Sequence, residues 1–315
     1  MKTVLITGAT GFIGSFLIKE FIKNYKVLCL VRPGTANLNR ISEFFDDTII
    51  HEHDIRQSLL PIADIVGPVD IILHAGGNPS AADSRINPMS VITDNVIGTA
   101  NLLEFARIQK LERFVYYSSG EVFGPIEVGK DSKETDVYNC QSPYAASKAA
   151  GEELCIAYSN SYNMPMSIIH INNTFGPKCQ NNRLPVIILN NIMNKKELII
   201  HANHDGTISG RRWFHAEDVA NHTLFILNNQ IKLCEKWNSA GNKFINNLEF
   251  AQTFSQCLNS KLKYTIETIN NPDHKLCFSI DPSKLYSLGY SDLFSLEQRV
   301  QQTVDWYSKN PAWLK

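Results

Sequence analysis

The chain has little net charge, and it lacks the long charged or apolar runs that several classes of protein need. Lys and Arg number 30 and Asp and Glu number 31 among 315 residues, a formal net charge of −1. Because the Lys and Arg residues are scattered, the sequence predicts no basic surface for nucleic acid or for an anionic membrane. No apolar run approaches the length of a transmembrane helix. Met1 to Thr7 lead directly into a predicted strand, so no signal peptide is expected.

Cysteine is present, but not in a pattern typical of disulfides or metal sites. The seven cysteines are odd in number, widely spaced and free of any Cys-x-x-Cys pair: Cys29, Cys140, Cys155, Cys179, Cys234, Cys257 and Cys277. We therefore expect neither a disulfide framework nor a zinc site, and a reducing cytoplasm as the location. His51 and His53 alternate along a predicted strand with no third ligand in sight, so no metal is predicted.

Apolar strands alternate with helical patterns over the first half of the chain. The predicted strands are residues 4–6, 27–31, 49–50, 69–73, 113–117 and 166–171, and the main predicted helices are 96–108, 144–160 and 296–307. This alternation is typical of an α/β fold with a mostly parallel sheet, whose ligands gather at the carboxyl ends of the strands. The alternation loosens near residue 176. We expect a cofactor domain over residues 1–175 and a mainly substrate-binding lobe over 176–315, with segments that return to the first domain.

A glycine-rich loop follows the first predicted strand and opens a helix. It reads Gly8-Ala-Thr-Gly11-Phe-Ile-Gly14. In a dinucleotide site, the first glycine allows a tight turn, the second lets the backbone approach a pyrophosphate, and the third permits close helix–strand packing. A turn without a ligand is the alternative. The predicted cofactor contacts here are Gly8, Thr10, Gly11, Phe12, Ile13 and Gly14.

The end of the second predicted strand bears on the choice of cofactor. An acid there usually binds a free ribose 2′-hydroxyl, whereas an arginine suits a 2′-phosphate. This chain has Val31-Arg32 and no acid at either position, which slightly favours NADP over NAD. Arg32 could also stack on adenine without selecting either cofactor. Asp54 is a candidate contact to the adenine amino group or, alternatively, a helix-capping residue.

Tyr144 and Lys148 are four residues apart on a predicted helix, so both side chains lie on one face. An ammonium beside a phenol favours the phenolate, which can take a proton from an alcohol while hydride leaves the same carbon. The alternative is a chance pair on a surface helix. Together with the glycine loop, the pair indicates an oxidoreductase step on a hydroxyl group.

With both motifs placed, the chain resembles the extended short-chain dehydrogenase/reductase family, and within it the nucleotide-sugar epimerases and dehydratases. The resemblance covers nearly the whole length and implies a Rossmann-type doubly wound parallel sheet with a smaller C-terminal α/β substrate lobe. Besides the two motifs above, it is carried by residues 72–77, 95–99, 117–124, 172–177 and 211–218, and by Pro272-Asp-His274 followed by Asp281.

The resemblance implies roles for individual residues. Ser119 would donate a hydrogen bond to the reacting oxygen, Tyr144 would be the base, and Lys148 would hold the ribose and tune Tyr144. Further cofactor contacts would be Arg32, Asp54, Ile55, His74, Ala75, Gly76 and Asn95. The nucleotide-sugar substrate would contact Asn78, Ser119, Gly120, Asn173, Arg211 and His274, with Arg212 competing with Arg211 for the diphosphate.

Glu121 bears on the reaction itself. In the dehydratases, a glutamate two residues after the catalytic hydroxyl removes the C5 proton of a transient 4-ketone, and this loop reads Ser119-Gly120-Glu121. Gly120 departs from the dTDP-glucose enzymes, which carry an Asp that protonates the leaving hydroxyl. A 4,6-dehydratase is favoured, while a 4-epimerase and a UDP-glucuronate-type decarboxylase stay open. A non-catalytic NADP-binding sensor and an NADPH-linked ketone reductase are more remote. The resemblance also implies a homodimer formed by the helices near Asn95 and Tyr144.

Overall fold

The computed structural model describes residues 1–34, 37–268 and 276–314. The chain divides into two compact units. The first comprises residues 1–124, 134–171 and 219–239, and the second comprises residues 125–133, 172–218 and 240–315. Within the described residues, no helix is long and apolar enough to cross a bilayer.

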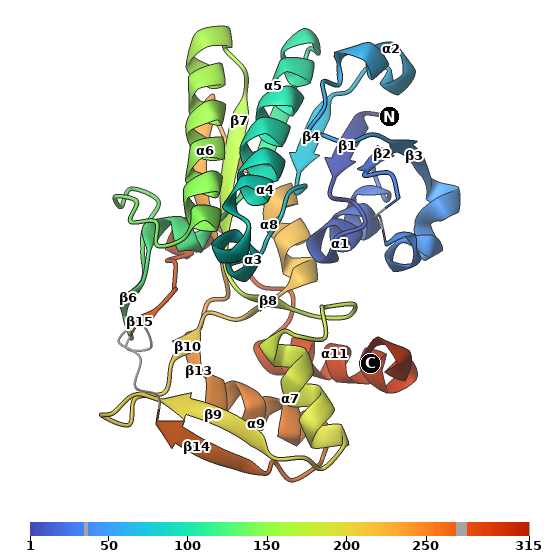
Figure 1. Ribbon diagram of the computed structural model, residues 1–315. Coiled ribbons are helices and arrows are strands. Elements are labelled where there is room, and N and C mark those ends of the chain that lie inside the picture. Colours follow the sequence, from blue (N-terminus) through green and yellow to red (C-terminus); the bar gives the residue numbers. More distant parts are fainter. Residues whose placement is uncertain (35–36, 269–275, 315) are drawn as a thin grey trace. The chain divides into compact units, whose positions relative to one another are not determined.

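The first unit is built on a seven-stranded sheet whose strands all run parallel (Figure 1). The order across the sheet is β12 (Cys234–Ser239), β7 (Met166–Ile171), β5 (Arg113–Ser119), β4 (Ile71–His74), β1 (Thr3–Thr7), β2 (Lys26–Val31) and β3 (Thr48–Glu52). The chain starts in the middle of the sheet and winds outward in both directions. This arrangement confirms the predicted α/β class and doubly wound parallel sheet.

Helices follow most of these strands and cover the sheet. They are α1 (Phe12–Phe21), α2 (Ala63–Val66), α3 (Ala81–Ile86), α4 (Pro88–Ile92), α5 (Gly98–Ile108), α6 (Pro143–Tyr162) and α8 (Ala216–Asn229). A π-helical turn over Thr93–Ile97 leads into α5, where the sequence predicted a helix from Val96. In α6, Ser142 accepts a hydrogen bond from the backbone N–H of Ala145 and Pro143 occupies the first turn, which sets the start of the helix.

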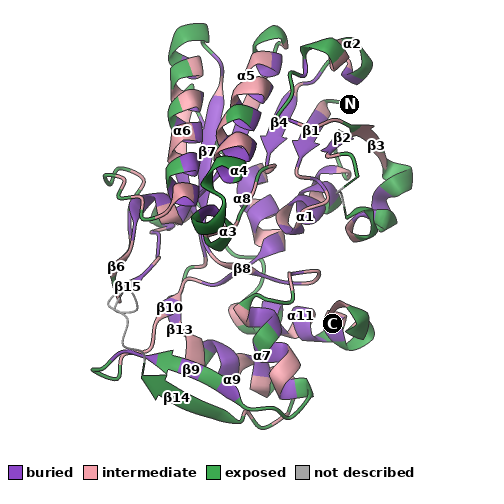
Figure 2. Cartoon of the chain, in the orientation of Figure 1, coloured by how far each residue is buried: buried purple, intermediate pink, exposed green. Residues whose placement is uncertain are grey.

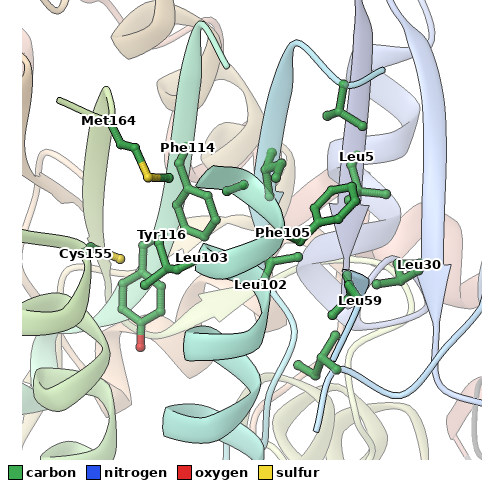
Figure 3. Packing of buried hydrophobic residues seen from close by; sticks show 14 of the residues in the cluster. Leu5, Leu30, Leu59, Leu102, Leu103, Phe105, Phe114, Tyr116, Cys155 and Met164 are labelled. Atoms are coloured by element: carbon green, nitrogen blue, oxygen red, sulfur yellow. The ribbon is translucent and has the colours of Figure 1, made fainter. Parts of the chain in front are cut away.

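The core of the first unit lies between the sheet and helices α5 and α6, which run side by side (Figure 3). Leu102, Leu103 and Phe105 of α5 are fully buried against Leu5 of β1 and Phe114 of β5. Leu102 and Leu103 thus belong to the chain's own core. Figure 2 shows the central strands of this sheet buried, the edge strand β3 partly exposed, and α5 and α6 exposed on their outer faces.

The second unit has short paired strands and four helices among its described residues. The strand pairs are β6 (Ile126–Glu127) with β15 (Leu276–Cys277), β8 (Thr174–Phe175) with β11 (Phe214–His215), β9 (Leu198–Ala202) with β14 (Tyr264–Thr268), and β10 (Gly210–Arg211) with β13 (Ile245–Asn246). The helices are α7 (Leu184–Met193), α9 (Asn247–Cys257), α10 (Ser283–Ser287) and α11 (Leu296–Lys309). Trp213 stacks on Phe250, with 4.4 Å between ring centroids, and Phe175 contacts the same Phe250 ring, so these aromatic side chains form much of the core of this unit.

Candidate active site

The glycine loop joins β1 to α1 at the carboxyl edge of the sheet. Gly8 has φ +68°, and a Cβ atom there would lie 2.5 Å from the carbonyl oxygen of Ala75. A Cβ atom at Gly14 would lie 2.1 Å from the carbonyl oxygen of Gly8. Both positions therefore require glycine. Gly11 occupies the N-cap of α1, and within the described residues no side chain caps this helix and no acid stands in its first turn. The loop fits a pyrophosphate, because backbone N–H groups at the start of α1 can donate to its oxygens.

Arg32, at the end of β2, lies beside two carboxylates. Its Nη2 donates to Asp94 Oδ1 at 2.8 Å, and its Nε lies 3.9 Å from Asp54 Oδ1. Asp54 also accepts hydrogen bonds from Arg56, and these bonds hold the pKa of the Asp54 carboxyl below its usual value. Ile55 is buried, with its side chain against Gly98. An arginine already paired with carboxylates is a weaker attractor for a 2′-phosphate than a solvated one.

The loop after β4 is held by two buried polar side chains. His74 lies between the hydroxyls of Thr7 and Thr99, at 2.7 and 2.9 Å, and burial, with the nearby Lys148 charge, lowers its pKa to about 3. His74 is thus a neutral link between β1, β4 and α5. Asn95 accepts a hydrogen bond from the N–H of Asn78 at 2.7 Å and donates to the carbonyl of Asn78 at 3.1 Å.

Asn95 also connects this loop to α6. Its side-chain amide donates to Ser147 Oγ at 2.9 Å, and Ser147 in turn donates to the carbonyl oxygen of Tyr144 at 2.7 Å. Asn95 lies in the π-helical turn, a local geometry frequent at functional sites. The first turn of α6 is therefore fixed next to the loop that contacts Gly8. Tyr144, which is in this turn, lies at the carboxyl edge of the sheet, where the sequence predicts the dinucleotide.

Tyr144 and Lys148 are both buried, each 8% exposed. The Lys148 ammonium lies 4.4 Å from the centroid of the Tyr116 ring on β5. Gly151 makes room for this ring, since a Cβ atom there would lie 2.2 Å from the Tyr116 hydroxyl. Burial lowers the pKa of Lys148 to about 8, and the charge of Glu152 opposes that fall. A cation one helical turn from Tyr144 would stabilise its phenolate.

Ser119 is the last residue of β5 and caps the short 3₁₀ turn Gly120–Phe123 that follows. Its Oγ accepts a hydrogen bond from the N–H of Glu121 at 3.2 Å. Ser119 and Gly120 are buried and Glu121 is partly buried. The hydroxyl and the carboxylate therefore belong to one capped turn at the carboxyl end of β5.

The predicted substrate contacts Asn173 and Arg211 belong to the second unit. Arg211 donates to Ser209 Oγ at 3.0 Å and to the carbonyl of Gly210 at 2.7 Å. Its neighbour Arg212 instead forms an ion pair with Asp131, with Nη2 2.6 Å from Oδ2, and Asp131 raises the pKa of Arg212. This pairing leaves Arg211 the better candidate of the two. Pro272, Asp273 and His274 lie outside the described residues.

Sequence reasoning missed a buried polar cluster around Glu152. Its carboxylate accepts hydrogen bonds from Ser118 and Tyr138, and His170 Nε2 lies 3.2 Å from it. The sequence spacing could have indicated this cluster, because Glu152 follows Lys148 by four residues and Ser118 directly precedes Ser119. Among the residues that the structure describes, no group of three or more His, Cys, Asp or Glu side chains could hold a metal ion.

Comparisons with known proteins place this geometry in a family. Residues 4–238, well over half of the chain, match the model of the NAD dependent epimerase/dehydratase family. The dTDP-glucose 4,6-dehydratase of Salmonella typhimurium is 29% identical over 344 residues, which cover 99% of this chain and 94% of the relative. The structure of a double mutant of the dTDP-glucose 4,6-dehydratase from Streptomyces venezuelae, with NAD bound, matches with TM-score 0.86 and 25% identity over 99% of each chain.

A UDP-glucose 4-epimerase from Thermus thermophilus, solved in complex with NAD, has the same fold, with TM-score 0.85 and 22% identity over 97% of this chain and 99% of that one. The matched region contains the glycine loop, the Ser119 turn and the Tyr144–Lys148 helix. These findings confirm the family resemblance that the sequence motifs indicated. The chain is an enzyme of the NAD dependent epimerase/dehydratase family, with an NAD(P)-type cofactor.

Proposed function

We propose that this protein is a nucleotide-sugar 4,6-dehydratase that acts through transient oxidation at C4 of the sugar. The observation that carries the proposal is the capped turn at the end of β5, which presents Ser119 and Glu121 together in the unit that holds Tyr144 and Lys148. Relatives 25–29% identical over almost the whole chain are dTDP-glucose 4,6-dehydratases. An elimination needs a base besides the group that deprotonates the C4 hydroxyl, and Glu121 provides one.

In the proposed first step, Tyr144 takes the proton of the C4 hydroxyl. A bound nicotinamide cofactor would supply the acceptor for the hydride from that carbon and would later supply the same hydride back to the sugar. The ammonium of Lys148, one turn from Tyr144, stabilises the phenolate, and Ser119 Oγ–H donates to the oxygen that becomes the ketone. The glycine loop at Gly8 and Gly14 has the close backbone contacts that a pyrophosphate cradle requires.

In the proposed second step, Glu121 removes the proton at C5, which the neighbouring ketone has made acidic. Water then leaves from C6. Gly120 supplies no acid for the departing hydroxyl, so the proton must come from another group or from solvent.

A 4-epimerase or a UDP-glucuronate-type decarboxylase would use the same Ser119, Tyr144 and Lys148, and these remain the second candidates because Glu121 suits the decarboxylase as well. Net consumption of NADPH would instead indicate a ketone reductase, one of the more remote alternatives.

We propose that Arg211, rather than Arg212, binds the substrate diphosphate, together with Asn173. A guanidinium binds phosphate oxygens in pairs, which makes an arginine the natural group for this role. Arg212 is held by Asp131 and also donates to the carbonyl oxygen of Asn242 at 2.6 Å. Arg211 donates to Ser209 Oγ and to the carbonyl oxygen of Gly210, which leaves the proposal to rest on the ion pair that holds Arg212.

The choice between NAD and NADP is a separate part of the proposal. Arg32 by itself favours NADP, but Asp94 and Asp54 lie beside it and would repel a 2′-phosphate. We therefore propose NAD, and expect Asp94→Asn to narrow the difference in affinity between NAD⁺ and NADP⁺. Titration of the apoprotein with each cofactor checks this, and tighter binding of NADP⁺ to the unaltered protein would contradict it.

The test of the main proposal is incubation with UDP-, dTDP-, GDP- and CDP-sugars, followed by mass analysis. Loss of water supports the dehydratase, loss of carbon dioxide the decarboxylase, and unchanged mass with altered retention the epimerase. Glu121→Gln should lower dehydration by about 100-fold or more. It should still allow cofactor reduction, seen as absorbance at 340 nm, whereas Tyr144→Phe should lose both. Dehydration at near the original rate in Glu121→Gln would refute the assignment of the base.

A further inference from the structure

A buried carboxylate lies behind the candidate site. Glu152 is fully buried on α6, one turn beyond Lys148 and on the same helical face. Burial alone would raise the pKa of its carboxyl, but the contacts with His170, Ser118 and Tyr138 outweigh burial and lower it. Glu152 is therefore ionised at neutral pH. A fixed negative charge in the interior is costly unless it is paired and hydrogen-bonded.

The hydrogen bonds of Glu152 tie together the elements that carry the candidate catalytic side chains. Ser118 is on β5, directly before Ser119, and His170 is on β7. Tyr138 bonds the same carboxylate and also accepts from Lys236 on β12, whose ammonium lies 3.6 Å from Glu152. Thus one carboxylate on α6 is anchored to three adjacent strands of the sheet, and the anchor lies one residue from Ser119 and one turn from Lys148.

We propose that Glu152 is a positioning residue for this site, which fixes α6 against β5 and holds a negative charge beside Lys148 so that the lysine stays an ammonium. Only one part of this inference rests on the proposed function: the purpose of the Lys148 ammonium, which is to stabilise the Tyr144 phenolate. Its physical basis is the pairing of a buried cation with a buried anion: without the anion, burial would drive Lys148 toward its neutral form. A neutral lysine would no longer stabilise a Tyr144 phenolate.

Other ionisable groups act on the same pair. Those that interact with Lys148 or Glu152 from the surrounding elements are His74, Tyr116, Tyr138, Cys140, Cys155, His170 and Lys236. Lys236 partly cancels the charge of Glu152. Removal of Lys236 should therefore shift the titration of Lys148 in the opposite direction from removal of Glu152.

The decisive measurement is the titration of Lys148 by carbon-13 NMR in protein labelled at the lysine ε-carbons. The signal is identified by its absence from Lys148→Met. Glu152→Gln should lower the midpoint by about 1 to 2 pH units, because it removes a unit charge one helical turn away at an effective dielectric constant of ~20. Glu153→Gln, which removes the same charge from the neighbouring exposed position, is the matched control and should leave the midpoint unchanged. Glu152→Asp keeps the charge, so its Lys148 midpoint should lie close to that of the original protein.

An unchanged midpoint in folded Glu152→Gln would overturn the proposal. If that variant does not fold, Lys236→Met serves instead: the side chain of Lys236 is 25% exposed, and its loss should raise the Lys148 midpoint by about half a pH unit. No rise would then overturn the proposal. Because the titration needs no substrate, a shifted midpoint in a protein that converts no nucleotide sugar would refute the proposed function while leaving this inference intact.

Discussion

Lys148 is a group whose burial works against the stability of the fold, and its replacement tests the electrostatics of the site directly. Its pKa is about 8 in the folded protein, compared with 10.5 for an ordinary lysine. Below pH 8 the folded state must therefore hold a buried ammonium that prefers water. The difference of about 2.5 pH units corresponds to roughly 3 kcal/mol at ~1.36 kcal/mol per unit. Lys148→Met removes this cost, but it also loses the contact with Tyr116, which contributes about 1 kcal/mol.

We therefore expect Lys148→Met to be more stable than the original protein by about 2 kcal/mol at pH 7. The advantage should disappear as pH rises. Between pH 8 and 10.5 the unfolded chain binds more protons at this lysine than the folded protein does, so the contribution of Lys148 to stability increases with pH. The difference in unfolding free energy between the two proteins should change by about 2–3 kcal/mol between pH 7 and pH 10. Loss of packing would shift this difference equally at every pH.

Urea unfolding of both proteins at pH 7, 8, 9 and 10 measures this change. Titrating groups that do not interact with Lys148 contribute equally to both proteins and cancel in the difference. Lys110→Met, at an exposed lysine, is the control and should show no such trend. A Lys148→Met protein whose stability differs from the original by the same amount at pH 7 and pH 10 would refute the reasoning, because it would mean that Lys148 has an ordinary pKa in the fold.

Two further predictions concern the glycine loop and the adjacent arginines Arg211 and Arg212. Gly14→Ala should destabilise the protein by about 3 kcal/mol or more, measured by urea unfolding, since its Cβ would overlap the carbonyl oxygen of Gly8 and neither backbone can yield. Arg211→Ala should weaken nucleoside diphosphate binding at least about tenfold by calorimetry. Arg212→Ala should leave that affinity nearly unchanged and lower stability by about 2 kcal/mol, because Asp131 loses its ion-pair partner. An equal loss of affinity in both arginine variants would contradict the assignment.

Much of the fold could be predicted because the central strands are short apolar runs. A buried parallel strand needs apolar side chains on both faces, and Met166–Ile171 shows this so clearly that its predicted bounds match the structure. The ends of the helices and strands were predicted less accurately. Residues 69–70 were predicted as strand but precede β4, and the helix predicted from Val96 continues back through a π-helical turn. Hydrophobic pattern alone does not encode how the last hydrogen bonds of an element are arranged.

The pairing of side chains from distant parts of the chain could not be predicted from the sequence. Arg32 and Asp94 are 62 residues apart, and nothing at either position indicates that they form an ion pair. For the same reason the choice between Arg211 and Arg212 depended on Asp131, about 80 residues earlier. Such contacts arise from the arrangement of whole elements, so a charge that looks available in the sequence can already have a partner in the fold.

In the proposed mechanism the turn after β5 decides the reaction, since the role proposed for the Tyr144–Lys148 pair would be the same in a dehydratase, an epimerase and a decarboxylase. Ser119 accepts the hydrogen bond from the Glu121 N–H, so the residue proposed to assist oxidation also fixes the residue proposed to drive elimination. Ser119→Ala removes the hydroxyl and loosens the turn, at about 1 kcal/mol for the lost cap. It therefore disturbs both steps together. Glu121→Gln leaves that backbone bond in place, and only this variant can separate elimination from oxidation.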